Sequence, residues 1–189
     1  MNGPLYLPGF ALVIGYFPAP IERVGSDGIR LERVLDAPPE TVWRYLTEAE
    51  LRRQWFMGGT DASAGGEFEM IVDHDNLSDE DVPYPESYAA SKGARFTDKV
   101  LRFDPPRLLE TTFGGSKGIV TYELRPENGR TRLVLTHSGI ASPTGYQDFG
   151  SGWTSHLAVL EAKIAGRGVP DFWALHAQSR ETVKAALGE

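Results

Sequence analysis

The sequence contains no cysteine. Disulfide bonds, thiolate metal sites and cysteine nucleophiles are therefore excluded as sources of stability or chemistry. The absence fits a reducing compartment, so we expect a cytoplasmic location. With 189 residues, the chain has the length of one domain and can bury a stable core without covalent cross-links.

Long basic runs are missing as well. The longest uninterrupted one is Arg52-Arg53, and the formal net charge of the chain is −7. Proteins that bind nucleic acids or anionic membranes usually present a basic face or stripe. The charge balance therefore argues against nucleic acid and against anionic membranes as partners.

The sequence also lacks an apolar run of membrane-spanning length. The apolar stretch from Phe10 to Phe17 is far shorter than the roughly 20 residues that a spanning helix needs. A signal peptide needs a basic start, and the first basic residue is Arg23. We therefore expect no membrane insertion. Residues 1–28 are predicted to form an N-terminal arm whose apolar side packs against the domain or against a second subunit of a homodimer.

What is present is a regular succession of structural signals. The turn-forming cluster Gly25-Ser26-Asp27-Gly28 separates the arm from an alternating stretch over 29–35, which predicts a strand. Pro38-Pro39 ends that strand, and a proline suits the first turn of a helix, here predicted over 40–46.

Five further stretches alternate apolar and polar residues with a period of two. One apolar and one polar face is the pattern of an antiparallel sheet that is covered on one side. Short connectors rich in glycine, proline and asparagine predict consecutive hairpins. The residues that share the apolar face are Phe68, Met70 and Val72; Phe96, Asp98 and Val100; Leu109, Thr111 and Phe113; Val120, Tyr122 and Leu124; and Leu133, Leu135 and His137.

A long helix is predicted to cover this apolar face. Its residues recur at helical spacing, namely Phe149, Trp153, His156, Leu157, Leu160 and Ile164. Gly166 and Gly168 end it, and an additional helix is predicted within 169–189. Residues 74–93 are acidic, include two prolines and show no period, so we predict an inserted loop that has little to bury. It would form a mobile flap beside the mouth of a cavity between sheet and helix.

Six short motifs, in this order and spacing, are similar to those of a known superfamily. They are Asp36 to Trp43, Leu51 to Trp55, Gly65 to Phe68, Phe103 to Leu109, Thr136 to Gly139, and Gly152-Trp153 with Leu157 and Leu160. The chain resembles the SRPBCC, or START-like, helix-grip superfamily over residues 29–165. Within it, the chain is similar to the bacterial branch related to the C-terminal domain of the heat-shock-protein-90 ATPase activator.

The resemblance implies an α+β fold in which a curved antiparallel sheet wraps around a long C-terminal helix. Residues 29–168 would form this domain, between the arm and the additional helix. Members of the superfamily bind lipids, hormones and polyketides between sheet and helix, and some are cyclases or hydratases. We therefore predict that a small apolar or amphipathic molecule binds in such a cavity, although the same inward residues could fill a solid core.

The residues predicted to line the cavity are inward by strand parity or lie on the long covering helix, except Trp55, which lies on a short helix predicted to begin near Thr47. They are Trp55, Phe68, Met70, Phe96, Asp98, Thr111, Phe113, Tyr122, His137, Trp153, His156 and Leu160. The polar members among them need hydrogen-bond partners, because burying a polar group without one costs roughly 1–3 kcal/mol. They could form a structural network, orient a ligand, or perform acid–base catalysis in which Asp98 supplies a carboxylate to His137 or His156.

Three functions therefore remain open: ligand binding, catalysis of the cyclase or hydratase type, and protein interaction of the chaperone-activator type. Binding is the prediction, with no catalytic residue, metal or cofactor. The acidic residues after Asp73 lack the ligand spacing of a calcium loop. Gly114 to Gly118 lies between two strands and lacks the residue order of a phosphate-binding loop, so it is predicted to be a hairpin turn.

Overall fold

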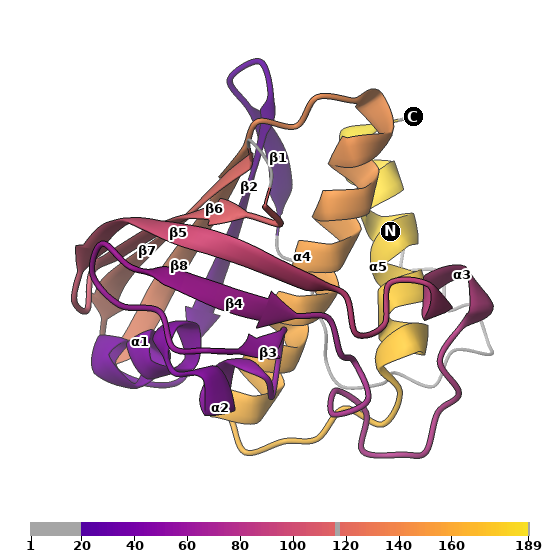
Figure 1. Ribbon diagram of the computed structural model, residues 1–189, viewed down its shortest axis with the longest axis horizontal. Coiled ribbons are helices and arrows are strands. Elements are labelled where there is room, and N and C mark those ends of the chain that lie inside the picture. The colour runs from indigo at the N-terminus through magenta and orange to yellow at the C-terminus, as the bar shows by residue number, and fades with distance from the viewer. Residues whose placement is uncertain (1–19, 116–117, 189) are drawn as a thin grey trace, which may run out of the picture.

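The computed structural model of the protein describes residues 20–115 and 118–188. A curved sheet wraps around one side of the long helix α4 (Pro143–Ile164), and α5 (Phe172–Leu187) runs beside α4 (Figure 1). The predicted α+β helix-grip fold is confirmed. Most of the predicted N-terminal arm, residues 1–19, lies outside the described residues.

The sheet has eight strands in the order β1-β2-β8-β7-β6-β5-β4-β3, and all neighbours are antiparallel. The strands are β1 (Ile21–Val24), β2 (Gly28–Leu35), β3 (Gly58–Gly59), β4 (Glu67–Ile71), β5 (Arg95–Asp104), β6 (Leu108–Phe113), β7 (Gly118–Glu127) and β8 (Arg130–Ser138). The register of β5 against β6 shifts between Val100 and Arg102. Such an irregularity bends a strand and increases its twist, which favours the curvature of the sheet.

Strand parity is as predicted, because alternate residues of a strand point to opposite faces. On β8, Leu133 and Leu135 are fully buried against the core. The hairpin between β7 and β8 turns at Asn128 and Gly129, which both have positive φ, at 51° and 80°. An Asn-Gly pair tolerates these angles, and the turn that they form matches the twist of the flanking strands. The short strands β1 and β3 were not predicted.

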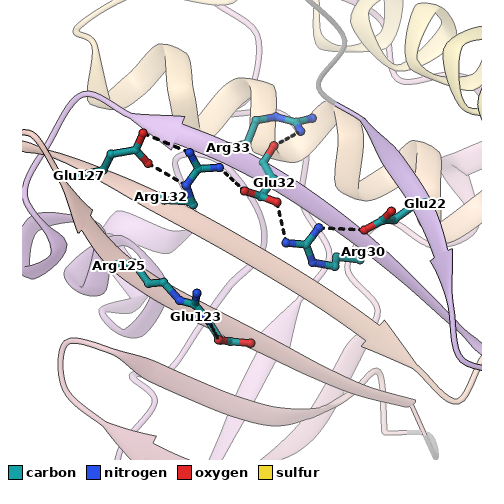
Figure 2. Close-up of polar contacts among 8 residues, drawn as sticks. All are labelled: Glu22, Arg30, Glu32, Arg33, Glu123, Arg125, Glu127 and Arg132. Carbon is teal, nitrogen blue, oxygen red and sulfur yellow. Dashed lines mark hydrogen bonds and ion pairs between the residues drawn. The ribbon is translucent and has the colours of Figure 1, made fainter.

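Ion pairs cover the outer face of the sheet across four strands (Figure 2). Glu32 accepts hydrogen bonds from Arg30, at 2.6 Å, and from Arg132. Arg30 also pairs with Glu22, at 2.8 Å, and Arg132 with Glu127, at 2.7 Å. Opposite charges on adjacent strands stabilise a solvent-facing sheet modestly. The network makes the outer face of the sheet polar. A site for an apolar ligand is therefore expected on the inner face.

Three short helices lie in the connections of the sheet: α1 (Pro39–Thr47), α2 (Ala49–Arg52) and α3 (Glu86–Ala89). α1 covers the predicted helix 40–46, begins one residue earlier at Pro39, and buries Val42, Trp43 and Leu46. The Trp43 ring meets Phe103 edge to face, with ring centroids 5.0 Å apart. In the described ranges, no helix is both long and apolar enough to cross a membrane.

Helix α4 begins earlier than its apolar period indicates. Ser142 is its N-cap and accepts a hydrogen bond from the amide of Gly145 at 3.1 Å, and Pro143 is the first helical residue. Gly150 of α4 lets α5 and β1 pack closely against α4. A Cβ atom there would lie 2.8 Å from Ile21 Cδ1 and 2.9 Å from Val183 Cγ1.

The segment 74–93 is docked against the rest of the domain, although it has little regular structure. Leu77 is fully buried, so the expectation that this segment has little to bury is wrong. The amide of Asp79 donates to the carbonyl of Val169 at 2.8 Å, and the hydroxyl of Ser78 accepts from the amide of Phe172 at 2.9 Å. These bonds fix the segment to the connection between α4 and α5, and its mobility stays a prediction.

Candidate ligand-binding cavity

A cavity of about 600 Å³ lies where the inner face of the sheet meets α4, α5 and the segment 74–93. Its walls come from parts of the chain that are far apart in sequence. The sheet and the segment after α2 contribute Phe56, Met57, Met70, Val72, Phe96, Asp98, Phe113 and Gly114. The segment 74–93 contributes His74, Tyr88 and Ser91; α4 contributes Asp148, Phe149, Gly152, Trp153 and His156; and α5 contributes Phe172, Trp173, His176 and Arg180.

Aromatic rings make up much of both walls. On the sheet side, Phe56 stacks on Trp153 with centroids 4.9 Å apart, and Phe113 lies 5.3 Å from Trp153. On the α5 side, Trp173 stacks on Tyr88 at 5.0 Å. Flat aromatic faces suit apolar or aromatic ligands.

The predicted site residues fall into two groups. Six of them line the cavity: Met70, Phe96, Asp98, Phe113, Trp153 and His156. The others are buried in the core behind the wall: Trp55, Phe68, Thr111, Tyr122, His137 and Leu160. Whether any of them contacts a ligand stays a prediction.

No residue of α5 or of the segment 74–93 was among the predicted site residues, although the segment was predicted to lie beside the cavity mouth. Trp173, His176 and Arg180 are spaced three and four residues apart, which places them on one face of α5. That spacing is readable in the sequence and could have marked the face as functional. Tyr88 lies in a segment without any period, so no such signal was present for it.

All four histidines of the chain lie at the cavity or directly behind it. His74, His156 and His176 line it, and the His137 ring lies 4.5 Å from Phe149 and 4.9 Å from Phe113. Burial lowers the pKa of His74, His137 and His176 from the ordinary 6.5 to about 4. Burial also lowers the pKa of His156 well below 6.5. The four rings are therefore neutral near pH 7.

Hydrogen bonds fix the tautomers of the two histidines that were predicted to act together. Nδ1 of His137 accepts from the Trp153 indole N–H at 3.0 Å, so its Nε2 carries the proton. Nδ1 of His156 lies 2.8 Å from the carbonyl oxygen of Trp55, which can only accept, so this Nδ1 carries the proton. His137 stands beside Trp153, and His156 packs against Phe56 at 4.8 Å. The two rings thus have separate partners.

Asp98 is inward and buried as predicted, but its hydrogen bonds are not to a histidine. One carboxylate oxygen accepts from the Thr112 hydroxyl at 2.8 Å and from the Gly115 amide at 3.1 Å. The other accepts from the Gly114 amide at 3.0 Å. This carboxylate holds the turn after β6, which corrects the expectation that it supports His137 or His156.

His176 connects three elements through a directed chain of hydrogen bonds. The Ser155 hydroxyl donates to the carbonyl of Ser151 at 2.9 Å, so it accepts from Nδ1 of His176 at 3.0 Å. Nε2 of His176 then accepts from the Tyr88 hydroxyl at 3.0 Å, and Tyr88 accepts from Arg180 at 3.3 Å. The chain ties the segment 74–93 to α4 and α5 at the edge of the cavity.

The arrangement is better suited to binding than to acid–base catalysis. A general base works best with a pKa near the working pH, whereas burial keeps the pKa of these imidazoles low. Among residues 20–115 and 118–188, no group of three or more acidic or histidine side chains is placed to hold a metal ion.

Comparison with known proteins places this architecture in a family. The sequence profile of the activator of Hsp90 ATPase homolog 1-like proteins matches residues 36–165. The chain belongs to this family. The family profile therefore includes the sheet from α1 onward and α4, and it ends before α5.

Solved structures share the fold of this chain. The BPP1335 protein of Bordetella parapertussis, solved by NMR, is 34% identical with a TM-score of 0.74, over 98% of this chain and 97% of that one. CalU16 of Micromonospora echinospora is 23% identical, TM-score 0.62, over 86% and 89% of the two chains. EF2215 of Enterococcus faecalis is 20% identical, TM-score 0.60, over 89% and 91%. A comparison with curated proteins found no match.

Proposed function

We propose that this protein binds one small, largely apolar molecule per chain in the cavity between the sheet, α4 and α5. The observation that carries the proposal is the cavity itself, about 600 Å³ with aromatic rings on both walls. Ligand pockets typically enclose about 300–1,000 Å³ and are apolar with a few polar groups. The polar groups here are neutral imidazoles and hydrogen-bonded side chains, which suits an uncharged or amphipathic ligand.

Catalysis and protein interaction are not part of the proposal. The cyclase or hydratase alternative needed Asp98 beside a histidine, and the hydrogen bonds of Asp98 go to the turn after β6 instead. A chaperone-type partner needs an exposed complementary patch. Of the described residues, the large hydrophobic side chains that are exposed are Leu101 and Phe149, and Phe149 belongs to the cavity wall. Isolated exposed apolar residues are normal on a protein surface.

Gly152 offers a direct test. It lines the cavity from the middle of α4, and a Cβ atom there would have nothing within 4 Å. A leucine at this position would therefore extend into the cavity without meeting the backbone. Replacing a helix glycine also favours the helix by about 0.5–1 kcal/mol, so Gly152→Leu should fold.

The experiment is a fluorescence titration with the uncharged probe N-phenyl-1-naphthylamine. We expect saturable binding at one site per chain for the wild type, similar binding for the matched control Gly152→Ala, and binding weakened at least tenfold for Gly152→Leu. Thermal unfolding of all three proteins checks the fold. Absence of saturable binding to the wild type, or undiminished binding to a folded Gly152→Leu protein, would show that this cavity is not the site.

A further inference from the structure

His156 is a polar residue of the cavity wall whose single hydrogen bond to the described residues fixes its tautomer and leaves one nitrogen unused. It is 5% exposed and lies deep in the cavity, with Phe56 at 4.8 Å, Phe172 at 5.1 Å and His74 at 5.3 Å between ring centroids. Its ring is thus held by packing on several sides. A side chain so constrained has a fixed orientation toward the cavity.

The orientation of the ring determines which atom is left for a ligand. The Trp55 carbonyl accepts a hydrogen bond from the N–H at Nδ1. The neutral ring therefore has its lone pair on Nε2. In an imidazole the two nitrogens point in different directions, so Nε2 is directed away from that carbonyl. Within residues 20–115 and 118–188, Nδ1 is the only nitrogen of His156 that makes a hydrogen bond.

Two of the neighbouring polar groups, His176 and Asp98, have no comparable free capacity, whereas His74 uses Nδ1 with the Tyr84 hydroxyl at 2.7 Å, a bond that leaves its tautomer open. Both nitrogens of His176 are bonded, to Ser155 and Tyr88. Both carboxylate oxygens of Asp98 are bonded to the turn after β6. A buried acceptor without a donor is unfavourable. Nε2 of His156 is not among the buried side-chain atoms that lack a partner in the described residues, so it is open to the cavity. A ligand that displaces water from this atom has to supply a donor or leave the lone pair unpaired.

We propose that Nε2 of His156 accepts a hydrogen bond from the ligand, so that the cavity selects aromatic molecules that carry a hydroxyl or N–H donor. The inference rests on the proposed function and narrows it. The aromatic walls provide affinity for the ring system, and the His156 acceptor provides the preference for a donor. An ether or a hydrocarbon of the same shape leaves the acceptor unpaired and loses this contribution.

The test compares two probes of nearly equal shape, 2-naphthol and 2-methoxynaphthalene, by isothermal titration calorimetry. 2-Naphthol is uncharged near pH 7 and has a donor, and methylation removes it. One neutral hydrogen bond corresponds to about 3- to 10-fold in affinity. Because the methyl group also changes hydrophobicity, the informative quantity is the ratio of the two affinities compared between wild type and variants.

Two variants remove the acceptor in different ways. In His156→Asn the side-chain amide can keep a donor for the Trp55 carbonyl; Nε2 is lost, and the amide oxygen that remains lies closer to the backbone than Nε2 did. In His156→Phe the aromatic shape is kept and both nitrogens are lost. We expect the ratio of naphthol to methoxynaphthalene affinity to fall about 3- to 10-fold in each variant, with methoxynaphthalene binding retained.

A measurement on the wild type alone keeps the inference testable if a variant does not fold. The ¹⁵N resonance of Nε2 of His156 should move when 2-naphthol is added and stay in place with 2-methoxynaphthalene. Equal ratios in wild type and variants, or an unmoved Nε2 resonance with 2-naphthol bound, would overturn the role of His156 while leaving the binding function intact. Failure of both probes to bind the wild type would instead contradict the proposed function.

Discussion

Lowering the pH should unfold this protein because its four histidines are buried in the neutral form. Three of them have a folded-state pKa of about 4, compared with 6.5 in an exposed chain. The unfolded chain therefore binds protons at a pH where the folded chain does not. For a base whose pKa is lowered by folding, the contribution to stability is complete above pH 6.5 and is lost as the pH falls toward 4.

The size of the effect follows from the two pKa values. Between pH 7.5 and pH 5, each such histidine reduces the free energy of unfolding by about 2 kcal/mol, and three of them by about 6 kcal/mol. Domains of this size are stable by about 5–15 kcal/mol. The ion-paired Glu32 has little effect in this window. Arg132 and Arg30 lower the pKa of Glu32 below 4.5, so its contribution is lost only at lower pH.

Urea unfolding at several pH values between 7.5 and 5, followed by tryptophan fluorescence, measures this loss. His137→Asn is the matched variant, because the asparagine oxygen can replace Nδ1 as the acceptor for the Trp153 indole while the titrating group is removed. Between pH 7.5 and pH 5, this variant should lose about 2 kcal/mol less of its free energy of unfolding than the wild type loses. If the free energy of unfolding of the wild type changes by less than about 1 kcal/mol over this range, the reasoning is refuted. Proton binding by even one such histidine should lower this free energy by about 2 kcal/mol.

Three further predictions concern packing, the hydrogen-bonded segment and the outer face. Gly150→Ala should destabilise the protein by about 1–3 kcal/mol in urea unfolding, since the added methyl group has no room between α4 and its neighbours. Gly152→Ala is the control: its methyl group has room, so this variant should be at least as stable as the wild type. Tyr88→Phe removes the donor to His176 and should cost about 1–2 kcal/mol, with faster proteolysis inside 74–93 than in wild type; unchanged cleavage would argue against this tie. Glu32→Gln should cost less than about 1 kcal/mol, with the loss shrinking in about 1 M salt, because its bond to Arg132 is only partly buried.

The sheet could be predicted from the sequence because strand parity is a local property. Leu133, Leu135 and His137 alternate with polar residues, and this alternation alone assigns them to the inner face. The partners of inward polar residues depend on register, which brings distant positions together. Asp98 pairs with Phe68 on one side, and its carboxylate meets the turn at Gly114 on the other. The sequence pattern of β5 contains neither relation.

The second wall of the cavity could not be predicted for a related reason. Helical spacing shows that α5 has a face with Trp173 and His176, but not what that face meets. Its partner Tyr88 lies in a segment whose residues follow no period. The segment takes its position from isolated contacts, such as buried Leu77 and the hydrogen bond to Val169, and no local pattern encodes them.

The position of α5 along the chain has a consequence for comparing this protein with its relatives. The family profile ends at residue 165, and α5 begins at Phe172, so part of the cavity wall belongs to a segment that family members need not share. Two proteins with the same sheet and α4 can therefore enclose different spaces. Replacing α5 alone would reshape the cavity while leaving the helix-grip core unchanged, which makes this helix the natural place to alter the specificity of the proposed ligand site by design.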